Sequence, residues 1–272
     1  MDKIKFGCQT YAWYMSYDKY IGRIPEIMDM MSENRYEGLE TTLDFLTPGN
    51  RMEFQGCLER TGLKLGAFGM GLAWLNEDET QEEFELANQV IALVKKFPGT
   101  LLMLSHNPVG DRTGDLVKKQ HNQIGIVNKV AQRAAKEGLS CAYHANSADN
   151  ALFRTNEDYN RLISLLDTSV IGWAPDIGHM ANGNCDIMSL LSANISLIKH
   201  VHYKDMLADH SWTPMGKGII DYVAITELLR SGNYSGWIMV EDESPESKED
   251  PNAVAAYNAC YISDHLRLKR GK

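Results

Sequence analysis

Short apolar runs rich in β-branched and aromatic residues alternate along the chain with longer stretches in which apolar residues recur every three or four positions. The short runs are typical of buried strands, and the longer stretches are typical of helices that bury one face. Eight strand-like runs can be counted, and they begin near Ile4, Tyr36, Leu63, Leu101, Leu139, Val170, Ile198 and Trp237. Repeated alternation of this kind predicts an α/β fold built on parallel strands.

The helical stretches have recognisable ends. Residues 81–97, 116–136 and 156–166 are predicted helices, and Gly99 and Gly138 follow the first two, as a glycine commonly does at the end of a helix. The 272 residues are close to the roughly 250 of one closed barrel of eight βα units, although two ordinary domains would also fit this length. Since no linker or low-complexity segment interrupts the pattern, we predict a single (β/α)8 TIM barrel domain spanning residues 1–272.

Composition narrows the function. The net charge of -9 argues against nucleic acid as a partner, because such binding draws on clustered Lys and Arg. The five cysteines show no CxxC spacing and are expected to be reduced thiols. The sequence contains no run of eighteen consecutive apolar residues, so no membrane span is predicted, and no secretion signal is visible. We therefore expect a cytoplasmic protein with a small-molecule substrate and no membrane partner, and a homo-oligomer stays open.

Four strand-like runs finish on polar residues that can bind a metal: His144, Asp176, His202 and Glu241. In a barrel the C-terminal ends of the strands converge on one face, so these residues are expected to meet. Two imidazoles and two carboxylates suit Mn²⁺, Co²⁺, Zn²⁺ or Fe²⁺ better than Ca²⁺, which prefers oxygen ligands alone. A single histidine near an apolar strand is more often structural, so this hypothesis rests on the four residues together.

For three other residues near predicted strand ends, both a functional and a structural role are open. His179, three positions after Asp176, could bind the metal or transfer a proton, or it could cap a helix. His106 could contact a substrate or be structural. Trp74 could stack on the C–H face of a sugar or pack between a strand and a helix. Glu40 ends the second run, and its role is undecided.

Four segments in the C-terminal half carry a resemblance to a known family. These are Pro175-Asp176-Ile177-Gly178-His179, His200-Val201-His202-Tyr203-Lys204-Asp205, Trp212 with Met215-Gly216-Lys217-Gly218-Ile219-Ile220-Asp221, and Gly236-Trp237-Ile238-Met239-Val240-Glu241. They resemble, in order, a D-T-G-H turn, an H-x-H-x-K-D strand, a W-x-x-L-G-x-G-x-x-D segment and the last ligand strand of the xylose-isomerase-like barrels. That family includes sugar epimerases, inosose dehydratases and DNA repair enzymes of the endonuclease IV type.

The resemblance implies a metal-dependent sugar isomerase or epimerase. It assigns the metal, with Mn²⁺ as the first expectation, to His144, Asp176, His202 and Glu241. Glu241 would also take the α-proton of a ketose or keto-polyol, giving a metal-stabilised enediolate, and His179 or Lys204 would return the proton. The expected substrate-binding residues are Lys204, His106, Trp74, Trp212 and Glu40.

One departure from the family pattern bears on the reaction. The family usually has a glutamate on the fifth strand, where this chain has His144, so epimerisation by two opposed glutamates is in doubt. Tyr143-His144 resembles the Y-H-x-H of the inosose dehydratases, with Asn146 in place of the second histidine. Dehydration is therefore an alternative to isomerisation, and a catalytically silent sugar-binding barrel is another. A DNA endonuclease is disfavoured, because its zinc cluster needs about nine ligands and the chain is acidic.

Overall fold

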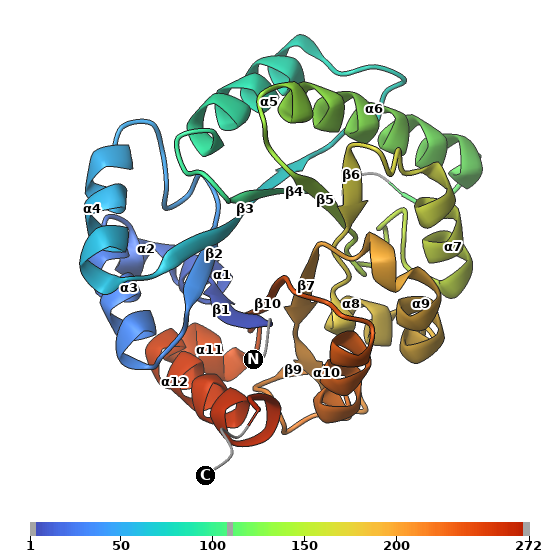
Figure 1. Cartoon of the computed structure of the whole chain (residues 1–272). Helices are drawn as coiled ribbons and strands as arrows, with labels where there is room; N and C mark the ends of the chain where they lie inside the picture. Colours follow the sequence, from blue (N-terminus) through green and yellow to red (C-terminus); the bar gives the residue numbers. More distant parts are fainter. Residues whose placement is uncertain (1–3, 108–110, 269–272) are drawn as a thin grey trace. The chain divides into compact units, whose positions relative to one another are not determined.

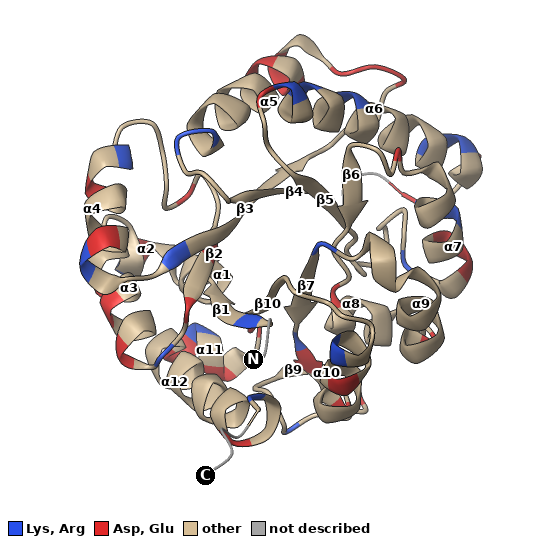
Figure 2. Cartoon of the chain, in the orientation of Figure 1, with Lys and Arg blue, Asp and Glu red and all other residues tan. Residues whose placement is uncertain are grey.

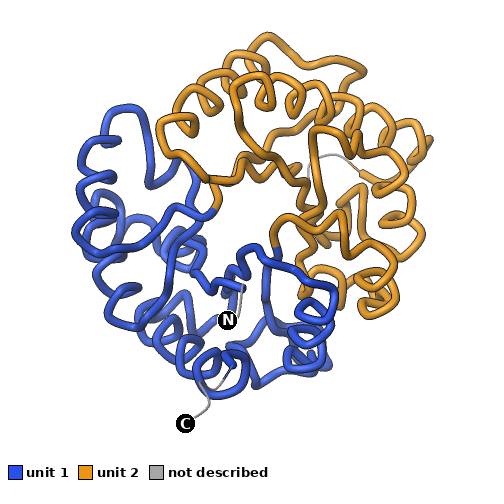
Figure 3. Tube along the Cα trace, in the orientation of Figure 1, with its two compact units in different colours: residues 1–66, 201–272 blue, residues 67–200 orange. Residues whose placement is uncertain are grey.

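The computed structural model describes residues 4–107 and 111–268. Its contacts divide the chain into two compact units (Figure 3). Unit 1 comprises Met1–Gly66 and Val201–Lys272, and unit 2 comprises Ala67–His200. The boundaries fall inside two strands, β3 (Lys64–Leu72) and β7 (His200–Tyr203).

Unit 1 is built on strands hydrogen-bonded in the order β2-β1-β10-β7 (Figure 1). Strand β1 pairs in parallel with both neighbours, with Gln9 beside Glu40 and Cys8 beside Val240. A short antiparallel pair, β8 with β9, follows β7. The elements of unit 1 are β1 (Lys5–Gln9), α1 (Tyr11–Tyr14), α2 (Tyr17–Tyr20), α3 (Ile24–Glu33), β2 (Gly38–Thr41), α4 (Arg51–Thr61), β7, β8 (Asp205–Met206), β9 (Trp212–Thr213), α10 (Tyr222–Ser231), β10 (Trp237–Val240), α11 (Pro245–Glu249), α12 (Pro251–Tyr261) and a π-helix (Ile262–Leu266).

Large side chains of β10 fill the space beside glycines of β1 and β2 in unit 1. A Cβ added at Gly7 would lie 2.4 Å from the Met239 sulfur, and one at Gly38 would lie 2.6 Å from the Trp237 ring. Any larger residue at either position would displace these buried side chains. Because successive strand residues face opposite sides, Trp237 and Met239 share one face of β10.

Unit 2 contains strands in the order β3-β4-β5-β6 (Figure 1). The pairs are parallel, with Leu72 beside His106, Ser105 beside His144 and Tyr143 beside Trp173. The elements of unit 2 are β3, α5 (Gln81–Val94), β4 (Leu101–His106), α6 (Leu116–Lys136), β5 (Cys141–His144), α7 (Asn156–Leu165), β6 (Ile171–Trp173), α8 (Ile177–Asn182), α9 (Ile187–Asn194) and a 3₁₀ helix (Ile195–Leu197).

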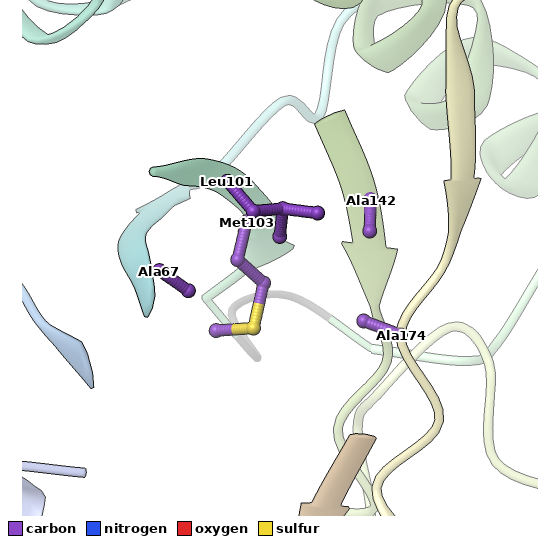
Figure 4. Packing of buried hydrophobic residues seen from close by; sticks show 5 residues of the cluster. All are labelled: Ala67, Leu101, Met103, Ala142 and Ala174. Carbon is purple, nitrogen blue, oxygen red and sulfur yellow. The ribbon is translucent and has the colours of Figure 1, made fainter. Parts of the chain in front are cut away.

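A cluster of small and large apolar side chains lies on one face of these four strands (Figure 4). Leu101 and Met103 project from β4 toward Ala67, Ala142 and Ala174, which lie on or just after the neighbouring strands. The alanines leave room for the Met103 side chain, so the layer is filled by one long residue among short ones. This is the packing expected of parallel strands that are covered on both faces.

Most predicted elements are found where the sequence placed them. Helix α6 has the predicted bounds, strand β4 begins at the predicted Leu101, and Gly99 and Gly138 adopt the left-handed conformation expected after a helix end. Four details differ. Helix α5 ends at Val94 rather than Phe97, and helix α7 ends at Leu165 rather than Leu166. Strand β6 ends at Trp173, so Asp176 is the N-cap of helix α8 rather than a strand residue, and strand β10 ends at Val240, so Glu241 follows the strand.

Charged residues fall mainly on the helices and loops of each unit, with both signs interspersed, and few fall on the strands (Figure 2). Charges buried at strand ends therefore stand out as candidates for a functional role. Among the described helices, none has both the length and the apolar character needed to cross a bilayer.

Candidate functional site

Unit 1 contains a group of buried charged residues centred on His202 of β7. Both ring nitrogens of His202 contact carboxylate oxygens. Its Nδ1 lies 2.7 Å from Oε2 of Glu241, the residue after β10, and its Nε2 lies 2.9 Å from Oε2 of Glu40 on β2. All three side chains are buried. Burial alone would lower the pKa of His202, but the two carboxylates outweigh it and raise the pKa to about 10. Two buried carboxylates thus converge on one imidazole ring.

Lys204 supplies a second buried cation beside Glu241. Its Nζ lies 3.1 Å from Oε1 of Glu241 and 2.6 Å from Oε1 of Glu243, and it sits 5.3 Å from the centre of the Trp212 ring on β9. Burial raises the pKa of Glu243 to about 7, with Lys204 acting in the opposite direction. The sequence motifs did not single out Glu243. Its spacing of two residues from Glu241, just beyond a buried strand, is the signal that could have found it.

Asp205 and Asp221, two acidic residues of the motif segments, accept hydrogen bonds from backbone N–H groups. Oδ2 of Asp205 accepts hydrogen bonds from the backbone N–H groups of Gly216 and Gly218, at 2.9 and 3.1 Å, and its Oδ1 accepts one from Met206. Asp221 caps helix α10 by accepting the N–H of Ala224. These carboxylates shape the segment after β7.

The unit 2 group consists of His144, at the end of β5, with Asp176 and His179. Asp176 divides its two oxygens: Oδ1 accepts the backbone N–H of His179, and Oδ2 lies 3.5 Å from Nε2 of His144. This N-cap hydrogen bond fixes the Asp176 carboxylate at the start of α8, so the helix also sets the position of Oδ2. The rings of His144 and His179 are 5.7 Å apart, centre to centre, and nearly perpendicular.

His179 is oriented by two residues that sequence reasoning missed. Its Nδ1 lies 2.8 Å from the hydroxyl of Ser147, and Asn182 donates a hydrogen bond to the same hydroxyl. With Nδ1 engaged in this way, Nε2 is turned toward Asp176, whose Oδ2 is 3.9 Å away. A histidine held so is a positioned group that can exchange a proton.

His106 and Trp74 lie near the ends of β4 and β3. Burial lowers the pKa of His106 to about 4, so its ring is neutral near pH 7. Trp74 is fully buried in a left-handed conformation, with φ of 44°, and its backbone N–H donates to Oε1 of Glu83. Within the described residues, neither His106 Nε2 nor Trp74 Nε1 has a hydrogen-bond partner.

The structure thus groups the sequence-predicted residues by unit. Glu40, His202, Lys204 and Glu241 contact one another in unit 1, with Trp212 beside Lys204. In unit 2, His144, Asp176 and His179 form the second group. Two of the four predicted metal ligands, His202 and Glu241, are in contact in unit 1. The other two, His144 and Asp176, lie next to each other in unit 2.

The chain belongs to the xylose isomerase-like TIM barrel family, whose model matches residues 28–261. Since that match covers most of the chain, the predicted family and the TIM barrel fold class are confirmed. Whether residues 1–272 form a single domain stays a prediction.

Two relatives of the chain are named inosose dehydratases. The chain is 32% identical to the inosose dehydratase of Lactiplantibacillus plantarum over 174 residues, which cover 57% of this chain and 55% of that protein. It is 24% identical to the inosose dehydratase of Clostridium botulinum (strain Alaska E43) over 297 residues, covering 98% and 99%. The expectation of an enzyme of the sugar isomerase, epimerase and dehydratase type is thereby confirmed at the level of class.

Solved structures show the same fold at low identity. The D-psicose 3-epimerase of Clostridium cellulolyticum, solved with D-tagatose, has a TM-score of 0.76 at 17% identity, covering 97% of this chain and 100% of that one. The IOLI protein with a bound zinc atom has a TM-score of 0.77 at 13% identity, with the same coverage.

Proposed function

We propose that this protein is a divalent-metal-dependent enzyme that removes the α-proton of a ketose or keto-polyol, with dehydration as the preferred outcome. The observation that carries the proposal is the buried His202, held between Glu40 and Glu241 with Lys204 beside it. Such a cluster is costly to bury unless it serves a ligand or a reaction. The inosose dehydratase relatives favour the dehydratase outcome.

The donor set fits a transition metal. We propose that His144, Asp176, His202 and Glu241 hold one ion, since each is buried and offers one ligand atom of a type that Mn²⁺, Zn²⁺, Co²⁺ or Fe²⁺ accepts. Mn²⁺ stays the first expectation from the family resemblance, while the zinc in the IOLI protein supports Zn²⁺ as well. When bound, the ion would supply Lewis-acid polarisation of the substrate carbonyl and its neighbouring hydroxyl.

Glu40 has a role in this proposal that differs from the substrate contact expected from the sequence. Its bond to Nε2 of His202 leaves Nδ1 as the nitrogen next to Glu241. A carboxylate on the far nitrogen of a ligand histidine sets the tautomer and the ring orientation, and makes the ligand nitrogen more basic. We therefore propose that Glu40 positions His202.

The proton steps are assigned to three residues. Glu241 accepts the α-proton, while Lys204, 3.1 Å from its Oε1, balances the charge. In dehydration, the C–H bond and the β-C–O bond break, and His179 or Lys204 gives a proton to the departing hydroxyl, which leaves as water. In isomerisation, the same donor returns the proton to carbon.

Dehydration is preferred because the family's fifth-strand glutamate is replaced by His144. Two-base epimerisation needs a second base opposite Glu241. A carboxylate that binds the ion through one oxygen keeps its other oxygen as a base, whereas the neutral imidazole of His144, if it binds the ion through its one acceptor nitrogen, has no second nitrogen to accept a proton. Isomerisation, the outcome expected from the family resemblance, is the second candidate. Substrate contacts by His106, Trp74 and Trp212, a cytoplasmic location and a homo-oligomer stay predictions.

The experiment is solvent-deuterium exchange against a panel of inososes and ketoses, with metal content measured in every sample. We expect metal-dependent exchange by the wild type and a loss of about 10²- to 10⁴-fold in Glu241→Gln, the typical worth of one general base. Glu227→Gln, an exposed glutamate on α10, is the control and should match the wild type. Exchange that survives complete metal removal, or that is unchanged in Glu241→Gln, would contradict the proposal.

A further inference from the structure

Three strands of unit 2 place a row of residues beside His144 at their carboxyl ends. In the register of the sheet, Gly71 on β3 pairs with Ser105 on β4, and Ser105 pairs with His144 on β5. The metal-site proposal uses His144 and assigns no role to Gly71 or Ser105. Neighbouring strands lie about 4.8 Å apart, so a small molecule held next to His144 can also reach Ser105.

Ser105 and His144 face the same side of the sheet as the apolar cluster of unit 2. That cluster contains Met103 of β4 and Ala142 of β5 (Figure 4). Side chains alternate along a strand, so a residue two positions further on faces the same side. Ser105 stands in this relation to Met103. His144 stands in the same relation to Ala142, so the two polar residues continue one face of the sheet toward its carboxyl end.

Gly71 leaves open the space that a side chain would fill. A Cβ added there would lie 2.6 Å from Oδ1 of Asn107 and 3.0 Å from Oγ of Ser105. The backbone fixes Asn107 in this place, because its N–H donates a hydrogen bond of 3.0 Å to the carbonyl of Leu72 at the end of β3. The two polar groups therefore flank a single point above Gly71.

Ser105 and Asn107 have polar groups available to a ligand. Within residues 4–107 and 111–268, neither the Ser105 hydroxyl nor the Asn107 side-chain amide makes a hydrogen bond. Gly71 and Ser105 are partly exposed and Asn107 is exposed, so a molecule can reach them. A serine hydroxyl both donates and accepts, and an asparagine amide has two N–H donors and one acceptor oxygen. Each side chain can thus bind a hydroxyl group as donor or as acceptor.

The row favours uncharged hydroxyls over a phosphate or a carboxylate. None of Gly71, Ser105 and Asn107 carries a charge, whereas a phosphate site usually concentrates Lys, Arg or backbone N–H groups. Hydroxyl groups donate and accept, as these two side chains do. Because Ser105 and Asn107 flank one point, they suit two hydroxyls on neighbouring carbons of one molecule. A polyol carries such pairs.

We propose that Ser105 and Asn107 determine specificity by binding two neighbouring, non-reacting hydroxyls of the substrate above Gly71. The inference rests on the proposed function, because it takes the reacting part of the substrate to be held by an ion at His144. Hydroxyls bound away from the reacting carbon orient the substrate. Since these bonds are equally strong before and during the reaction, they lower KM and leave kcat unchanged.

The binding test uses the protein with added Zn²⁺ and two probes. Myo-inositol has a hydroxyl on every ring carbon, whereas cyclohexane-1,3,5-triol has no two hydroxyls on neighbouring carbons. In titrations followed by saturation-transfer difference NMR, we expect myo-inositol to bind more tightly than the triol. Its binding should weaken about 3- to 10-fold in Ser105→Ala and in Asn107→Ala, as loss of one hydrogen bond implies. Ser192→Ala and Asn160→Ala, at exposed positions on α9 and α7, are the matched controls.

The kinetic test separates substrate binding from support of the metal site. In the deuterium-exchange assay, Ser105→Ala and Asn107→Ala should each raise KM about 3- to 10-fold, with kcat and metal content unchanged. Gly71→Ala should raise KM as well, because its methyl group must displace one of the two polar side chains. Thermal unfolding of every variant checks that the fold is retained.

Three results would overturn the inference: myo-inositol binding no more tightly than the triol, unchanged binding in both folded alanine variants, or loss of metal in these variants with an unchanged KM. Myo-inositol binding that depends on Ser105 and Asn107, without any deuterium exchange, would refute the proposed function alone. Metal-dependent exchange with an unchanged KM in both variants would refute the specificity inference alone.

Discussion

Replacing Glu40 by glutamine changes one buried carboxylate that we do not assign as a metal ligand. The side chain is fully buried and its Oε2 lies 2.9 Å from Nε2 of His202. Glutamine has nearly the same shape, so packing is preserved while the negative charge is lost. If Glu40 orients His202 and strengthens it as a ligand, the variant should bind metal more weakly even though all four proposed ligands are present.

The expected magnitude follows from the role of such residues in metal sites. Loss of a carboxylate that supports a ligand histidine typically costs about 10- to 100-fold in metal affinity. This corresponds to about 1.4 to 2.8 kcal/mol, at 1.4 kcal/mol for each factor of ten. The measurement is a competition titration with a chromophoric chelator, using Mn²⁺ and Zn²⁺ in separate series.

Two companion variants make the result interpretable. Glu53→Gln changes an exposed glutamate on α4 and should bind metal like the wild type. His202→Ala removes the proposed ligand itself and should lose more affinity than Glu40→Gln. If Glu40→Gln bound metal as tightly as the wild type while His202→Ala lost it, the positioning role of Glu40 would be refuted. Equal retention in all variants would refute the ligand role of His202.

Three further predictions concern metal retention, pH and stability. Asp176→Ala should lose metal while Cys185→Ser keeps it, because Asp176 is a proposed anionic ligand and Cys185 is assigned no part in the site; equal metal contents by elemental analysis would contradict this. His106 has a pKa of about 4 when folded against 6.5 when unfolded, so its contribution to stability is complete above about pH 6.5 and is lost as pH falls toward 4. Denaturant unfolding should show His106→Gln losing less stability than the wild type between pH 7 and 4, by about 3 kcal/mol, and parallel losses would contradict the assignment. Asp205→Ala should lower the free energy of unfolding by about 1 to 3 kcal/mol, since it removes the acceptor of three backbone N–H groups, of which that of Met206 is buried, whereas Asp209→Ala, at an exposed aspartate, should change it less.

The resemblance in the C-terminal half selected residues that the structure does place in contact. His202, Lys204 and Glu241 came from motif segments, and the structure joins them through bonds of 2.7 and 3.1 Å. The same motifs also contain Asp205 and Asp221, which hold the backbone. The motifs therefore identified the segments that form the candidate site, but they did not separate the proposed catalytic and ligand residues from those that bind the backbone.

Local periodicity by itself determined the strands and most of the helix ends, because burial of one face and the conformational freedom of glycine act within a few residues. The partners of His202 were decided only by tertiary structure. Glu40 lies 162 residues away in sequence and Glu241 lies 39 residues away. Glu40 reaches His202 because β2 pairs with β1 in the register that places Glu40 beside Gln9. A shift of this register by one residue would turn the Glu40 carboxylate to the other face of the sheet. That register results from packing between distant segments, which a local pattern of residues does not encode.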